Sequence, residues 1–135
     1  GDIAPRCRDI LDTVNSPALQ AVFDPANFVQ CGQAVYPEAF DLISPYLVYM
    51  HIKDALANGS VVPAGMGIGG VSNILAALNA KGYEGFVSLE PHLGEFQGLA
   101  NLENGKAMKG LAQSTPEKFT LAFDSLNAIL QKISK

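Results

Sequence analysis

The chain has 135 residues, of which 48% are hydrophobic and 16% charged, and its formal net charge is −4 at pH 7. This length suits a single domain, residues 1–135, and the apolar content favours a packed core over intrinsic disorder. The nine lysine and arginine residues are scattered, which argues against a nucleic-acid partner because such a partner needs a basic surface.

The N-terminal part predicts a helix, a strand, a second helix and a second strand. These elements cover residues 5–14, 19–23, 37–43 and 46–52. Pro5 and Pro37 stand at the first positions of the two helices, where proline is tolerated, and Pro45 stops the second helix. Both strands are short apolar runs of the kind found in buried parallel sheets.

The C-terminal part predicts a helix over residues 71–81, a strand over residues 86–89 and a last long helix. Gly82 is expected to end the first of these helices. Thr115 and Pro116 open the last one, as N-cap and first helical residue. The order α-β-α-β-α-β-α predicts an α/β fold with parallel strands.

An oxygen or nitrogen donor follows each predicted strand: Asp24, His51 and Glu90. Parallel strands carry their C-terminal ends to the same edge of a sheet, so we expect these side chains to converge. One imidazole and two carboxylates suit a divalent metal ion. Three structural alternatives stay open: Asp24 as a turn residue before Pro25, His51 as a core histidine, and Glu90 as a helix cap or partner of a lysine.

Two glycine-rich or polar segments have less definite meaning. Residues 65–70 match G-x-G-x-x-G, but they follow a polar loop rather than a strand, which argues against a dinucleotide site. Their amides could hold an anion such as a sugar phosphate, although a tight turn is the simpler interpretation. Residues 94–114 predict a long loop, either a lid or a plain surface excursion.

The remaining general expectations concern partners and compartment. Three parallel strands leave two unpaired edges, which predicts self-association or a missing N-terminal half-barrel. No apolar run reaches the roughly 20 residues of a membrane span, and no secretory signal is visible, so we expect a cytoplasmic protein without a membrane partner.

Cys7 and Cys31 form no disulfide pattern and are interpreted as reduced thiols without a role.

The order and spacing of five stretches resemble the C-terminal part of the sugar phosphate isomerase/epimerase family, the xylose-isomerase-like TIM barrels. The stretches are Phe23-Asp-Pro-Ala-Asn27, His51-Ile-Lys-Asp54, Pro63-Ala-Gly-Met-Gly67, Gly82-Tyr-Glu-Gly85 and Ser88-Leu-Glu-Pro-His92. The resemblance implies a partial (β/α)8 TIM barrel, in which the three strands are equivalent to the last three of eight.

The resemblance also implies site residues. Asp24, His51 and Glu90 would be ligands of a divalent metal (Mn, Mg, Zn or Co), and Glu90 would also move the substrate proton. A fourth ligand, a Glu at the end of the fifth strand, would precede Gly1. The family often has a His where this chain has Asn27.

Four further residues are candidates for contact with substrate: Asn27, Lys53, Asp54 and His92. Two other roles stay open for Lys53 and Asp54. They could orient the ligand His51 without contacting the substrate, or they could form an ion pair at the surface.

The function that follows is a metal-dependent isomerase or epimerase of a small sugar or sugar phosphate, which transfers a proton beside a carbonyl. Two alternatives stay open. One is metal-dependent phosphodiester hydrolysis of the apurinic-endonuclease type, and the other is an inactive fragment that serves as an assembly unit.

Overall fold

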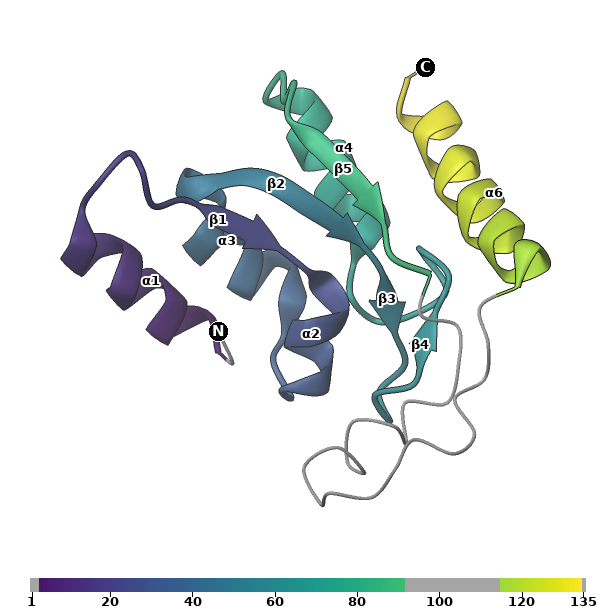
Figure 1. Ribbon diagram of the computed structural model, residues 1–135, viewed down its shortest axis with the longest axis horizontal. Helices are drawn as coiled ribbons and strands as arrows, with labels where there is room; N and C mark the ends of the chain where they lie inside the picture. The colour runs from purple at the N-terminus through teal and green to yellow at the C-terminus, as the bar shows by residue number, and fades with distance from the viewer. Residues whose placement is uncertain (1–2, 92–114, 135) are drawn as a thin grey trace.

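The computed structural model describes residues 3–91 and 115–134 (Figure 1). The elements are α1 (Ala4–Val14), β1 (Ala21–Phe23), α2 (Pro25–Gln30), η1 (Val35–Ala39), α3 (Phe40–Ile43), η2 (Ser44–Tyr46), β2 (Leu47–Ile52), β3 (Asp54–Ala55), β4 (Val61–Val62), α4 (Val71–Ala80), β5 (Phe86–Leu89) and α6 (Pro116–Ile133). The predicted α/β class is confirmed. The strands and helices are those of a partial TIM barrel, which does not close.

The main sheet has the order β1-β2-β5, and both pairings are parallel. The central strand β2 aligns Met50 with Phe23 on one side and His51 with Ser88 on the other. The three strands therefore end at the same edge. Immediately after β2, the chain forms a small antiparallel hairpin from β3 and β4.

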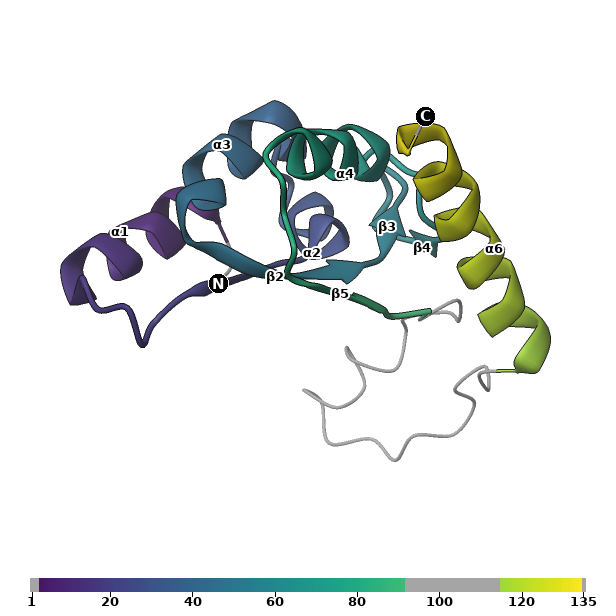
Figure 2. The same cartoon turned by 90° about the horizontal axis from the view of Figure 1, so that it is seen from above.

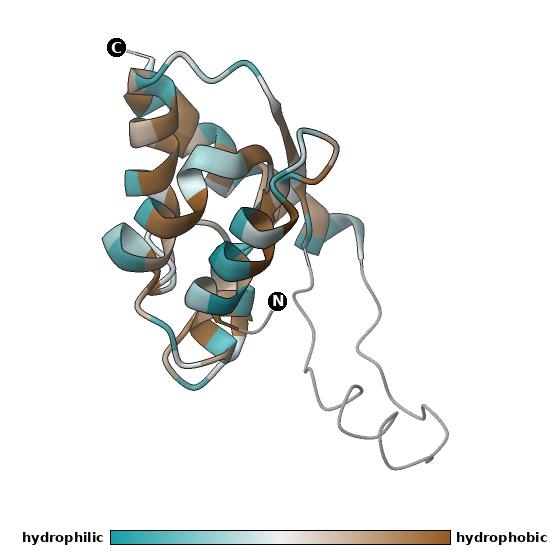
Figure 3. Cartoon of the chain, turned by 90° about the vertical axis from the view of Figure 1, so that its left-hand side faces the viewer, coloured by the Kyte–Doolittle hydropathy of each residue, from teal (hydrophilic) through white to brown (hydrophobic). Residues whose placement is uncertain are grey.

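One face of the main sheet forms the core. Phe23, Met50 and Ile52 are at most 2% exposed, and in Figure 2 helices α3 and α4 lie on one side of the sheet. Figure 3 shows hydrophilic and hydrophobic residues alternating along the helices, as expected for helices with one face on a core.

The opposite face of the main sheet is open within the described ranges. Val22, Tyr49 and Phe86 are register partners across the three strands and share this face. Val22 is 49% and Phe86 83% exposed. The apolar strands predict cover on both faces, but the described helices supply it on one.

The last helix, α6, begins as the sequence predicts. The Thr115 side chain accepts a hydrogen bond from the Lys118 amide at 3.3 Å, and Pro116 is the first helical residue. The helix packs against α4 through its buried residues, among them Leu126 and Ile129. Two large apolar residues of the predicted stripe stay exposed, Phe119 at 50% and Phe123 at 52%.

Several local predictions differ from the structure. Helix α2 and the β3–β4 hairpin are absent from the predicted elements because both are too short for a periodic pattern. The residues of the helix predicted over 37–43 are helical, but they fall in the π-helical η1 and in α3, and η1 begins two residues earlier, where Tyr36 has extended backbone angles. The loop predicted over 94–114 lies outside the described residues.

Among the described helices, none combines the length and the apolarity that crossing a lipid bilayer requires.

The two faces of the sheet predict different responses to truncation. Met50→Ala should lower the free energy of unfolding of the 135-residue chain by about 2–5 kcal/mol, because it leaves a cavity in the core. Phe86→Ala should cost less than about 1 kcal/mol, because the ring is exposed. Urea unfolding measures both. Equal costs would show that another segment or chain covers the open face.

Candidate metal centre

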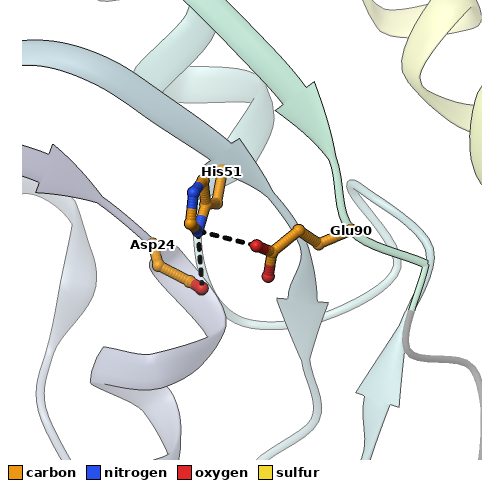
Figure 4. A group of neighbouring side chains, drawn as sticks. All are labelled: Asp24, His51 and Glu90. Atoms are coloured by element: carbon orange, nitrogen blue, oxygen red, sulfur yellow. Dashed lines mark ion pairs between the residues drawn. The ribbon is translucent and has the colours of Figure 1, made fainter.

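The ends of the three parallel strands bring Asp24, His51 and Glu90 together, as the sequence predicts (Figure 4). His51 Nδ1 lies 3.0 Å from Glu90 Oε1 and 3.6 Å from Asp24 Oδ2. One ligand atom from each residue lies within 4.8 Å of those of the other two. The geometric condition for a shared ion is met by the described residues.

The two carboxylate oxygens of Asp24 have different roles, one in the fold and one in the site. It is the N-cap of α2, and its Oδ1 accepts a hydrogen bond from the Asn27 amide at 3.2 Å. Pro25 occupies the first helical position, where no amide hydrogen is needed. The turn role that the sequence left open for Asp24 is therefore real, and it leaves Oδ2 directed at His51.

His51 and Glu90 are held by neighbouring strands. His51 stands in β2, where its ring meets that of Tyr49 edge to face with centroids 5.2 Å apart. Glu90 follows β5, and its amide donates to the carbonyl of Ile52 at 3.2 Å, which continues the parallel pairing. Both side chains are 27% exposed, so the centre is open to solvent on one side.

Lys53 adds a positive charge to this group. Its Nζ lies 2.9 Å from Asp24 Oδ2 and donates a hydrogen bond to Glu90 Oε2 at 3.0 Å. The lysine side chain is only 6% exposed. Burial by itself lowers the pKa of the ammonium, but contacts with both carboxylates outweigh it and raise the pKa above its ordinary value. The interpretation of Lys53 as part of a surface ion pair with Asp54 is wrong.

The residues present fit a divalent cation. Asp24 Oδ2 is buried and faces the Lys53 ammonium at 2.9 Å and His51 Nδ1 at 3.6 Å, so this oxygen already lies where a cation is favourable. Metal–ligand bonds of about 2.0–2.2 Å place neighbouring ligand atoms roughly 3–3.5 Å apart, close to the two distances measured from His51 Nδ1. One nitrogen and two carboxylate oxygens suit Mg, Mn, Co and Zn ions.

Asp54 is engaged elsewhere. Its carboxylate is completely buried and holds the glycine-rich loop that leads to α4. Oδ1 accepts from the amides of Ala55 and Gly69, both at 2.8 Å. Oδ2 accepts from the amides of Gly65 at 3.0 Å and Gly67 at 3.1 Å. Contact of Asp54 with substrate stays a prediction, and the geometry instead makes its carboxylate an anchor of the loop.

This arrangement also explains the glycines of residues 65–70. A Cβ at Gly67 would lie 2.3 Å from both Asp54 Oδ1 and Ala55 O, and one at Gly69 would lie 2.7 Å from the same Oδ1. Only glycine lets the loop approach the carboxylate this closely. The anion bound by these amides is the carboxylate of Asp54. The amides of Gly65, Gly67 and Gly69 are therefore already engaged and are not a phosphate-binding site.

The other two predicted contacts with substrate are less defined. Asn27 lies in the first turn of α2 with its side chain exposed, and its backbone amide is what contacts Asp24. Its contact with substrate stays a prediction. His92 lies outside the described residues.

Comparison with known proteins decides the family. The model of the xylose isomerase-like TIM barrel family matches residues 4–114. The chain belongs to this family. Members of the xylose isomerase-like TIM barrel family are generally enzymes of isomerase or epimerase type, and they often bind divalent metals. No curated protein matches the chain.

A solved structure gives the same fold. It is the xylose isomerase domain protein from Planctomyces limnophilus, with a TM-score of 0.66 and 25% sequence identity. The alignment covers 97% of this chain and 42% of that protein. The chain therefore spans less than half the length of this xylose isomerase-like relative.

The loop anchor predicts a loss of stability for Asp54→Asn. An amide nitrogen would replace one oxygen and face two amide donors, so the free energy of unfolding should fall by about 2–4 kcal/mol. Urea unfolding measures it, and Asp124→Asn, at an exposed position of α6, is the control. A loss below about 0.5 kcal/mol would show that the loop does not depend on the carboxylate.

Proposed function

We propose that this chain is the C-terminal part of a divalent-metal-dependent isomerase or epimerase that acts on a sugar or sugar phosphate. The observation that carries the proposal is the convergence of Asp24, His51 and Glu90 at the C-terminal edge of the parallel sheet. In barrels of this architecture, active sites lie at that edge. Family membership supports the reaction class.

The three converging side chains would hold the ion. When bound, a divalent cation would supply positive charge beside the carbonyl and the neighbouring hydroxyl, where negative charge develops during proton removal. Asp24 is fixed as a ligand by its second role as the cap of α2, because its Oδ1 is already bonded to the Asn27 amide. His51 is fixed by its place in the central strand.

Glu90 would move the proton. Its Oε1 is turned to His51, and its Oε2 is held by Lys53. We assign Oε2 as the oxygen that takes the proton from the carbon beside the carbonyl. In an isomerisation Oε2 would return the proton to the neighbouring carbon, and in an epimerisation a second carboxylate on the opposite face of the substrate would deliver a proton there. A side chain that is 27% exposed can be reached by a substrate from solvent.

The centre needs more protein than the described residues supply. The His51 and Glu90 side chains are each 27% exposed, and the outer strands β1 and β5 have no further neighbour among the described strands of this sheet. We propose that further barrel strands, or a second copy of the chain, complete the site and supply the remaining contacts to the sugar.

Exchange of a carbon-bound proton with solvent tests the proposed reaction. A panel of aldoses, ketoses and their phosphates in D2O with Mn²⁺ should gain deuterium beside the carbonyl in the presence of the full-length parent protein, as followed by proton NMR. Glu90→Gln should slow the exchange at least about 100-fold, because general-base catalysis is lost.

Glu84→Gln is the matched control, because Glu84 is an exposed glutamate in the turn before β5. It should keep the parent rate. Undiminished exchange in Glu90→Gln would remove Glu90 from the mechanism. Cleavage of abasic DNA by the same preparation, without any exchange, would replace the isomerase proposal with phosphodiester hydrolysis.

A further inference from the structure

The ammonium of Lys53 touches the same two carboxylates that face His51. Its Nζ lies 2.9 Å from Asp24 Oδ2 and 3.0 Å from Glu90 Oε2. Because alternate residues of an extended chain project to the same side, Lys53 follows His51 toward the site. The protein has thus placed a fixed positive charge beside the position proposed for the metal ion.

The carboxylates bridge the imidazole and the ammonium. Glu90 uses Oε1 toward His51 and Oε2 toward Lys53. Asp24 has no such division, because its Oδ1 already caps α2 and its Oδ2 alone faces both His51 and Lys53. A metal ion at His51 therefore has to share Asp24 Oδ2 with the ammonium or displace it.

Burial increases the energetic effect of these three charges on one another. Lys53 is 6% exposed, and a buried ammonium is costly unless carboxylates surround it. Without Lys53, the two carboxylates would lie close together around His51 with no positive charge from this side chain between them. Repulsion between them would destabilise the metal-free protein, and a divalent cation would relieve it.

We propose that Lys53 is a built-in cation that competes with the divalent ion for Asp24 and Glu90 and thereby sets the metal affinity of the centre. The proposal rests on the metal centre of the proposed function. In the metal-free protein, Lys53 keeps both carboxylates in place. When the ion binds, repulsion between the two cations weakens its binding, so the ion exchanges more readily than it would beside carboxylates alone.

Calorimetric titration with Mn²⁺ tests the proposal. It is carried out on the protein without substitutions, called the parent here, and on the Lys53→Met and Lys53→Arg variants. Lys53→Met has a similar length without the charge, and it should bind Mn²⁺ about tenfold more tightly or better. Its urea midpoint should fall below that of the parent without metal and rise more when Mn²⁺ is added. Lys53→Arg keeps the charge and should keep the affinity of the parent within about threefold.

Lys132→Met is the matched control, because it removes the same charge from an exposed position in the last turn of α6. It should leave Mn²⁺ affinity unchanged. If Lys53→Met is unfolded without metal, it is refolded in the presence of Mn²⁺. Recovery of the folded protein supports the proposal, and failure to recover it overturns the proposal.

The outcomes separate this proposal from the proposed function. Mn²⁺ binding by the parent with equal or weaker binding by Lys53→Met overturns the competing role of Lys53 and leaves the metal centre standing. Mn²⁺ binding by Lys53→Met alone supports the competition directly. No Mn²⁺ binding by any variant removes the metal centre, and the role of Lys53 with it.

Discussion

The parallel pairing of β2 with a strand on each side is the constraint from which the site follows. Because β1, β2 and β5 run in the same direction in a fixed register, Asp24, His51 and Glu90 emerge at one edge. This convergence brings two carboxylates close together, which is unfavourable unless positive charge lies between them. Lys53 supplies that charge in the described structure, and a divalent ion would supply more. The fold and the proposed chemistry are linked by this single electrostatic requirement.

Much of the candidate site could be predicted because it depends on short-range patterns. A polar residue directly after an apolar strand is visible in the sequence, and parallel topology then determines which edge the residue occupies. The C-terminal helix was equally predictable, since Thr115 and Pro116 form a standard start signal. The same signal, an N-cap followed by proline, stands at Asp24 and Pro25. It identifies α2, but six residues are too few to establish a hydrophobic period.

The contacts of Lys53 and Asp54 could not be predicted from local patterns. They are adjacent in the chain, yet Lys53 reaches carboxylates 29 and 37 positions away, whereas Asp54 holds amides of a loop 11–15 positions ahead. Such partners depend on where tertiary structure brings distant backbone. One signal was available in hindsight: glycines at every second position, 65, 67 and 69, predict a loop that approaches another group closely. The open face of the sheet was also missed, because apolar strands look the same whether or not a second layer covers them.

The central claim is that Asp24, His51 and Glu90 coordinate one divalent cation. Anomalous diffraction at the manganese edge, from crystals of the protein grown with Mn²⁺, tests it most directly. The account predicts a single strong peak within bonding distance, about 2.0–2.3 Å, of Asp24 Oδ2, an imidazole nitrogen of His51 and Glu90 Oε1. A peak elsewhere, or a fully occupied Mn²⁺ bound without these three residues, would contradict it.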